Sequence, residues 1–399
     1  MESVILEEVL EQPAERVSVK THAIPLYLYA TVLASFSIVI GIVWDLSWHL
    51  SIGRDGIFSP PHQAIYFGSV LAGVYSGFRV LKITIAGTSI ERSSSIRFWG
   101  IFYGSLGNLL CIWGALTMLV SAPFDDWWHN TYGLDVTLFS PPHTILLIGM
   151  VTIQFGAMIT AFTCLNTLTS AEEDHDQTQK RLYLLCILSC GFMLTMLYTI
   201  TQQFFARGNM HSARFYVIAC IIFPVILVSI SIAGRQRWGA TSAVLIYLAS
   251  YLGMMWILSL FPARPKLSPI LNPITHFQQG QFPLLLIVPA LAIDTITRRF
   301  KNRSRLIRSV LYATLFLLPL LLLQWPFGDF LMSPYARNWF FGAEGLGYDF
   351  DPTSEYRYAF RVTDTGITLA IGLTVAWIMG FISARTGITM GSWMRKIQR

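Results

Sequence analysis

A carboxylate and two imidazoles occur at ligand spacing near the start of the chain. Asp45 and His49 stand four residues apart in the segment DLSWH, and His62 ends the segment FSPPH thirteen residues later. Residues at i and i+4 share one face of a helix, so Asp45 and His49 are expected to lie over each other. The three side chains offer a metal ion one oxygen and two nitrogen ligands and leave positions open, which suits copper, zinc or iron.

The same pattern occurs a second time. Asp125 and His129 stand four residues apart in DDWWH, and His143 ends a second FSPPH segment fourteen residues later. In each FSPPH segment the serine can cap a helix and the first proline can occupy its first turn, which places the histidine in that turn as well. Each triad therefore predicts two antiparallel helices, joined by a short loop, that meet around one ion.

Two alternatives stay open at this level. Asp126 stands beside Asp125 and could be the ligand in its place, or could accept a hydrogen bond from a ligand histidine. A lone histidine near a membrane surface is more often an interfacial residue than a ligand, and a duplicated helix pair could keep this motif for structure alone. Ionisable residues within apolar spans are costly and usually functional, so we favour metal binding at both triads.

The elements that must hold these residues are apolar. Of 399 residues, 54% are hydrophobic and 13% are charged, and the mean hydropathy is +0.54. This composition is typical of a chain embedded in lipid. Runs long enough to cross about 30 Å of hydrocarbon predict an all-α integral membrane protein with about ten transmembrane helices in helix-hairpin pairs. The predicted spans are 24–50, 60–81, 97–124, 141–168, 181–205, 212–234, 239–261, 282–298, 306–325 and 364–386.

The basic residues predict the orientation of these spans. If the N-terminus is cytoplasmic and every span crosses, 20 of the 28 Lys and Arg residues fall on the inner side. Basic residues favour cytoplasmic loops, so we expect both termini in the cytoplasm and both triads toward the outer, periplasmic side of the cell's inner (plasma) membrane. The predicted regions are a cytoplasmic segment 1–23, a metal-binding four-helix region 24–168, and further membrane helices in 181–399 with an outer loop at about 326–363.

Composition also excludes several classes of protein. The net charge of +6 is explained by the inner loops, so the expected partner is the lipid bilayer and not nucleic acid. All five cysteines lie in apolar runs and none forms a CxxC pair, which argues against a disulfide framework or a thiolate metal site. The acidic first twenty residues lack the apolar core of a cleavable signal peptide, so the first span is expected to direct insertion.

Other ionisable residues are weaker candidates. His211 and His276 each precede a predicted span, where a cap or an interfacial role is the ordinary explanation and an additional ligand the alternative. Asp294 lies inside the eighth predicted span, beside either a polar channel or the inner interface. Arg54 and Asp55 are expected to pair in the loop of the first triad, with a role behind the metal ligands as the alternative.

The first triad and its surroundings resemble a known family. DLSWH, then Arg54 and Asp55, then FSPPH, is similar to the DxSWH, RD and FTPSH segments of the C subunit of particulate methane and ammonia monooxygenases, at the same spacing. The second triad matches the spacing of a second ligand set in that family, whose first residue is typically Asn where this chain has Asp125. The resemblance covers roughly residues 24–165.

The resemblance implies copper at two sites and particular partners. The implied ligands are Asp45, His49 and His62 at one site and Asp125, His129 and His143 at the other. The implied partners are an integral A-type subunit and a B-type subunit with cupredoxin domains, with a homo-oligomer as the alternative.

Three functions are considered. The first is a membrane copper monooxygenase, or its C-type subunit, that oxidises a small apolar substrate with O₂. The second is a membrane metal-binding, sensing or assembly protein without turnover. The third is a transporter, which fits less well because transporters keep ionisable residues near the bilayer midplane, whereas both triads are expected near the outer ends of their spans.

Overall fold

The computed structural model describes residues 24–53, 56–133, 139–167, 175–234 and 236–399. Within these ranges the regular strands are β1 (Ile96–Phe98) and β2 (Phe102–Gly104), which pair antiparallel, and the remaining regular structure is helical. The hairpin corrects the third predicted span, which was expected to begin at residue 97. The aromatic and aliphatic residues of the hairpin lengthen the apolar run in the sequence, but they lie outside the helix, which starts at Leu106.

Nine helices of the described residues are long and apolar enough to cross a membrane. This finding confirms an all-α, multi-pass membrane protein. The nine are α1 (Leu26–Ser51), α2 (Pro60–Ala86), α4 (Leu106–Tyr132), α5 (Pro141–Thr167), α6 (His175–Thr201), α7 (Ala213–Ala233), α8 (Gly239–Leu258), α10 (Arg305–Met332) and α11 (Gly366–Met394). A short helix, α3 (Ser89–Ser93), lies between α2 and the hairpin.

The eighth predicted span, 282–298, has a different form. Its helix, α9 (Ile287–Arg299), has 13 residues, which is about 20 Å at 1.5 Å per residue and short of a hydrocarbon layer of about 30 Å. The stretch before α9 has no regular secondary structure. Gln278 bonds to Ser47 near the end of α1, whereas Asp294 bonds to the first residues of α8. The chain therefore traverses the bundle partly as irregular backbone and partly as a short helix.

Buried tyrosines bond to the backbone polar groups of this irregular stretch. The Tyr198 hydroxyl lies 3.0 and 2.9 Å from the carbonyls of Gln281 and Phe282, and the Tyr247 hydroxyl accepts from the Leu284 amide at 2.9 Å. Lipid offers no hydrogen-bond partner, so non-helical backbone at membrane depth is tolerated only where protein or water supplies one. A hydropathy pattern registers the apolar side chains of such a segment and misses its backbone conformation.

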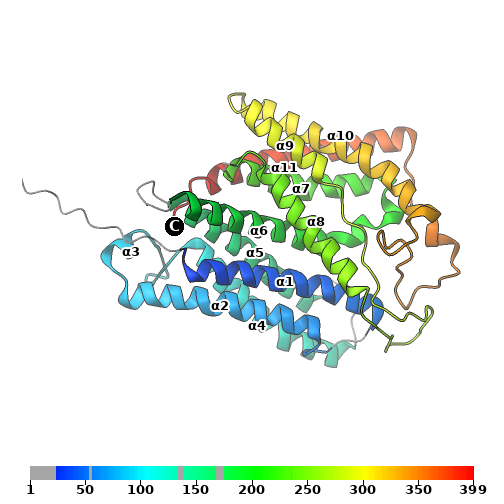
Figure 1. Ribbon diagram of the computed structural model, residues 1–399, viewed down its shortest axis with the longest axis horizontal. Helices are drawn as coiled ribbons and strands as arrows, with labels where there is room; N and C mark the ends of the chain where they lie inside the picture. The colour runs from blue at the N-terminus through cyan, green and yellow to red at the C-terminus, as the bar shows by residue number, and fades with distance from the viewer. Residues whose placement is uncertain (1–23, 54–55, 134–138, 168–174, 235) are drawn as a thin grey trace, which may run out of the picture.

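The helices form two groups joined through α6 and α8. The hairpins α1–α2 and α4–α5 pack against each other on one side, and α7, α9, α10 and α11 pack together on the other (Figure 1). We call the end of the bundle where α1 ends and α2 begins the triad end. α1 begins, and α11 ends, at the opposite end.

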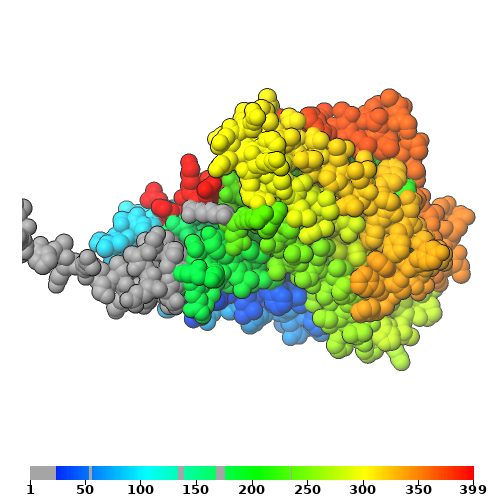
Figure 2. All heavy atoms as spheres, turned by 45° about the horizontal axis from the view of Figure 1, so that its top comes forward, coloured from blue at the N-terminus to red at the C-terminus, as the bar shows by residue number. Residues whose placement is uncertain are grey.

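The segment 333–365 covers part of the triad end, and we call it the cap. It starts later than the predicted outer loop, because Pro326 lies within α10, which continues to Met332. The Tyr348 amide donates to the Leu50 carbonyl at 3.1 Å, and the Leu271 amide donates to the Tyr348 carbonyl at 2.9 Å. Figure 2 shows the cap in orange beside the yellow-green loop that follows α8. The cap is thus bonded to the end of the helix that carries the first triad.

Candidate metal centre

The second triad is compact. Asp125 Oδ1 lies 3.4 Å from His129 Nε2 and 3.3 Å from His143 Nε2, and one ligand atom from each residue lies within 4.8 Å of the others. Two ligand atoms at 2.0–2.1 Å from one ion, at a tetrahedral angle, are roughly 3.3–3.4 Å apart. These two separations therefore match those around a single tetrahedral ion.

The hairpin α4–α5 supplies these ligands from facing helix ends. Asp125 and His129 lie in the last turns of α4, and His143 is the third residue of α5, as the FSPPH pattern predicts. The two helices approach closely at Gly114 and Gly149, where a Cβ added to either glycine would lie 2.7 or 2.9 Å from the carbonyl oxygen of the other. This contact holds the helices close enough for their ends to share one ion.

The first triad uses the same plan with looser geometry. Asp45 Oδ1 lies 3.3 Å from His62 Nε2, and Asp45 Oδ2 lies 3.7 Å from His49 Nε2. His62 lies in the first turn of α2, as predicted, with Ser59 at the N-cap position. The two histidines approach different oxygens of one carboxylate, so this triad is more open than the second.

Backbone carbonyls determine which ring nitrogen faces each carboxylate. His62 Nδ1 lies 3.0 Å from the Gly56 carbonyl oxygen, and His129 Nδ1 lies 3.2 Å from that of Gly133. A carbonyl oxygen only accepts, so each Nδ1 donates to it, and the Nε2 on the other side of each ring faces the carboxylate. Metal-bound histidines are oriented in this way by a partner on the other nitrogen.

The carboxylate oxygens provide a test of whether the residues fit a metal. Asp45 Oδ1 and Asp125 Oδ1 are buried and have no hydrogen-bond partner among the described residues. Each oxygen lies 3.3 Å from the Nε2 atom of a histidine, so a cation held between the two atoms would be bound by both. The donor set of one oxygen and two nitrogens therefore fits copper or zinc.

The two triads open onto one cavity. Its volume is about 110 Å³, and it is lined by ligands of the first triad together with His143 of the second. The rest of the wall consists of Leu46, Ile42, Ile65, Leu146, Leu147, Met150, Thr199 and Ile200, from α1, α2, α5 and α6. The sequence analysis missed these residues, because no local pattern indicates that α1, α5 and α6 meet here.

Other predicted candidates lie elsewhere. Asp126 is exposed and accepts from Asn130 Nδ2 at 3.2 Å, so the structure places Asp125, and not Asp126, beside the histidines. Arg54 and Asp55 lie outside the described residues, as does the predicted segment 1–23. His276 is exposed and bonds to Thr275 Oγ1 at 3.0 Å.

His211 and Asp294 have structural partners. His211 is stacked between Trp325 and Phe360, with ring centroids 4.2 and 3.8 Å away, and its Nε2 lies 3.4 Å from Asp329 Oδ1. Asp294 is buried and accepts hydrogen bonds at the start of α8. Neither residue lies in a triad.

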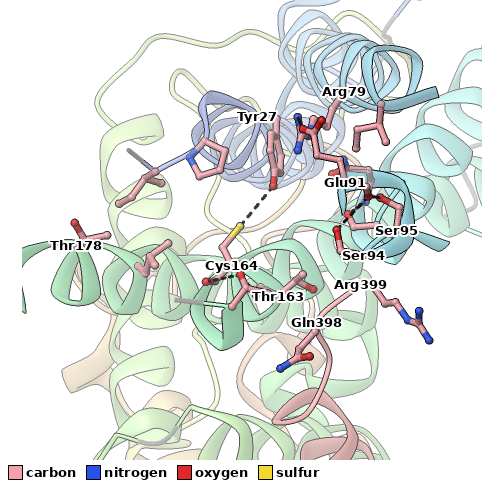
Figure 3. Close-up of a pocket in the computed structure, with 17 residues that line it drawn as sticks. Tyr27, Arg79, Glu91, Ser94, Ser95, Thr163, Cys164, Thr178, Gln398 and Arg399 are labelled. Atoms are coloured by element: carbon pink, nitrogen blue, oxygen red, sulfur yellow. Dashed lines mark hydrogen bonds and ion pairs between the residues drawn. The ribbon is translucent and has the colours of Figure 1, made fainter. Parts of the chain in front are cut away.

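A separate cavity lies at the opposite end of the bundle (Figure 3). Its volume is about 350 Å³, and its lining includes Arg79 and Glu91, whose charged atoms are 3.5 Å apart. Beside them the Tyr27 hydroxyl lies 3.7 Å from Cys164 Sγ. All five cysteines are free, as the sequence predicts.

The comparisons with known proteins give no relative. No family model, curated protein or solved structure matches the chain. The function is therefore inferred from the geometry of the site and from the sequence motifs.

Proposed function

We propose that the chain is a membrane copper protein that binds one ion at each triad and acts as the C-type subunit of a monooxygenase oxidising a small apolar substrate. The observation that carries this proposal is the cavity of about 110 Å³ bordered by both triads, each with a buried carboxylate oxygen that lacks a hydrogen bond. The resemblance of DLSWH and FSPPH to monooxygenase C subunits supports the same function.

Copper is favoured over zinc by that resemblance, whereas the ligand types alone admit either metal. When bound, copper supplies one-electron redox chemistry with O₂. Backbone groups of this chain orient the histidine ligands. The Gly56 and Gly133 carbonyls hold the Nδ1 atoms of His62 and His129, so that each Nε2 faces the carboxylate of its triad. Three protein ligands leave coordination positions for an exogenous molecule at each site.

The cavity wall favours a small apolar molecule. Leu146, Leu147 and Met150 of α5 face Ile42 and Leu46 of α1 across the space. An apolar wall excludes water from the triads and admits a lipid-soluble or gaseous substrate from the surrounding helices. The small volume limits the substrate to a few heavy atoms.

The orientation and partners belong to the same proposal. The basic residues concentrate at the end opposite the triads, which favours a cytoplasmic location for that end and an outer location for the triads. Electrons and further catalytic groups would come from A- and B-type subunits, because the described part of this chain contains membrane helices and a short cap.

The first test is the metal content of the purified full-length chain. We expect two copper ions per chain, and one after either His49→Ala or His129→Ala. His276→Ala is the matched control and should keep both, since this exposed histidine lies outside the triads. A chain without metal, or equal metal in all three variants, would reject the proposed sites.

The second test is turnover. The copper-loaded chain, copurified with its A- and B-type partners, should form a hydroxylated product from a small hydrocarbon or from ammonia, given O₂ and a reductant. A loaded, intact complex without product would reject the enzyme and leave a binding, sensing or assembly role.

Transport is a second candidate, favoured by the crossing at residues 278–299. Secondary transporters often build their sites from interrupted helices, and α9 is preceded here by non-helical backbone. Proteoliposomes carrying the chain should then accumulate copper, and Tyr198→Phe should slow this accumulation by removing the hydroxyl bonded to that backbone. Equal uptake with empty liposomes would reject transport.

A further inference from the structure

Four arginines gather at the triad end, where the cap meets the turn between α6 and α7. Arg207 lies in the turn between α6 and α7, and Arg337, Arg357 and Arg361 belong to the cap. Arg337 and Arg357 both lie over the ring of Tyr358, with the guanidinium carbon 3.5 and 5.1 Å from its centroid. Residues far apart in the sequence thus bring four positive charges to one place.

These charges are not neutralised by carboxylates in the described part of the chain. The ion pairs there include none of the four arginines. Their partners are instead carbonyl oxygens: Arg207 donates to Ala343, and Arg357 donates to Pro352 at 3.3 Å and to Glu344 at 3.4 Å. Carbonyls satisfy single N–H groups and leave the net charge in place.

Unused donors remain in the same cluster. The Nε atoms of Arg337 and Arg357 are buried and have no hydrogen-bond partner in the described residues. Burial, together with repulsion from the other three arginines, lowers the pKa of the Arg207 guanidinium from its usual value, although the Tyr358 hydroxyl opposes the shift. Clustered cations repel one another unless an anion lies among them.

The cluster borders a cavity. The cavity has a volume of about 220 Å³ and lies between the end of α1, the turn that carries Arg207, and the cap. Arg207, Arg357 and Arg361 line it, together with the amide side chains of Gln279 and Gln281. One carboxylate, that of the exposed Asp349, also lines the cavity, so the positive charges exceed the negative by two.

We infer that this cavity is a binding site for a phosphate-type oxyanion, held by Arg207, Arg357 and Arg361. The planar guanidinium group donates two parallel hydrogen bonds to a tetrahedral oxyanion, which explains a cluster of arginines and not lysines. The phosphate group is either free in solution or part of a lipid headgroup, since both present the same oxygens. The site is distinct from the triads and does not depend on metal.

An anion here would join two parts of the chain. The Arg361 amide already donates to the Gly208 carbonyl at 2.8 Å, next to Arg207. An oxyanion bridging Arg207 to Arg357 and Arg361 would add charge-assisted hydrogen bonds between the same two segments. Binding should therefore stabilise the native state, as any ligand that binds only the folded form does.

The experiment titrates inorganic phosphate into the delipidated full-length chain in detergent and follows the unfolding midpoint and calorimetric binding. A second arm places the chain in nanodiscs of phosphatidylcholine, with or without phosphatidylglycerol. Saturable phosphate binding in detergent indicates a free oxyanion. A rise in the midpoint only with phosphatidylglycerol indicates a lipid headgroup. No response in either arm overturns the inference.

Matched variants locate the response. Arg357→Gln should weaken binding about tenfold or more, the effect of losing one charge-assisted contact. Arg264→Gln removes an exposed arginine at the same end that does not line the cavity, and it should bind as the parent does. Equal weakening in both variants would overturn the assignment, because it would indicate general attraction to a basic surface. Circular dichroism and the unfolding midpoint without phosphate, measured in parallel, show that each variant is folded.

Discussion

Asp45 and His143 belong to different triads, yet both line the same cavity between α1, α2, α5 and α6. The carboxylate of the first triad and an imidazole of the second therefore face one small apolar space. If both triads hold copper, a molecule in this space would be adjacent to both ions. This relationship links the metal-binding proposal to a substrate.

Filling the cavity should separate metal binding from substrate binding. Leu146→Trp adds bulk to the cavity wall, so we expect unchanged copper content and a loss of xenon or substrate binding of about tenfold or more. The matched control is Ile148→Trp, on the same helix but exposed at 57%. Xenon uptake followed by NMR checks this, and equal uptake by Leu146→Trp and the parent would contradict the cavity as the substrate site.

Separating α4 from α5 should disrupt the second triad selectively. Gly149→Leu places a side chain where even a Cβ would lie 2.9 Å from the Gly114 carbonyl and 2.5 Å from Met118. Overpacking of this kind costs about 1–3 kcal/mol. We expect a lower unfolding midpoint and loss of the copper at Asp125, with the first site retained.

Elemental analysis of Gly149→Leu in a His49→Ala background measures the second site alone. Gly253→Leu is the control, because no atom lies within 4 Å of its added Cβ. Full copper in Gly149→Leu would show that helix separation does not govern the second triad.

The triads could be predicted because their geometry is local. Asp125 and His129 share a helix face by the i, i+4 rule, and the prolines of FSPPH fix His143 in the first turn of the next helix. A short loop then forces the two ends together. The choice between Asp125 and Asp126 needed the structure, because both lie near the end of the same helix.

Features that depend on distant contacts could not be predicted. The cavity requires α5 and α6 to meet α1, and no periodicity in a single span encodes that packing. The stretch before α9 has an apolar composition, but its non-helical backbone is bonded to the hydroxyls of Tyr198 and Tyr247 on other helices. The role of Asp294 was likewise hidden, because its partners lie 53 and 54 positions away in sequence.

Asp294 should be important for stability and not for metal binding. Its carboxylate accepts from the amides of Ala240 and Thr241 at 3.2 and 2.9 Å and from Ser231 Oγ at 2.6 Å. Asp294→Ala leaves those amides unsatisfied in a buried site, at about 1–3 kcal/mol for each group. We expect a markedly lower unfolding midpoint in detergent, with normal copper in the fraction that folds.

Two variants calibrate this prediction. Asp294→Asn keeps one acceptor oxygen and should lose less stability than Asp294→Ala. Asp176→Ala removes an exposed carboxylate paired with Lys180 and should change the midpoint little. Similar midpoints for Asp294→Ala and Asp176→Ala would contradict the capping role.

The two triads should differ in how readily acid releases their metal. Imidazole nitrogens must be unprotonated to bind an ion, so copper affinity falls as the pH decreases. In the second triad the Nε2 atoms of both histidines lie within 3.4 Å of one oxygen, Asp125 Oδ1. In the first triad His62 Nε2 lies 3.3 Å from Asp45 Oδ1, whereas His49 Nε2 lies 3.7 Å from the other oxygen, Asp45 Oδ2. The first triad, whose ligands are farther apart, should bind copper more weakly and lose its ion at a higher pH.

Single-site variants make this order measurable. His129→Ala leaves only the first triad and His49→Ala leaves only the second, so each copper signal can be followed alone by electron paramagnetic resonance during a titration from pH 8 to about pH 4. We expect the signal of His129→Ala to disappear at the higher pH, and to return when the pH is restored. Circular dichroism measured at each step separates release from unfolding. Release in the reverse order would mean that the compactness of the ligand set does not determine its affinity for copper.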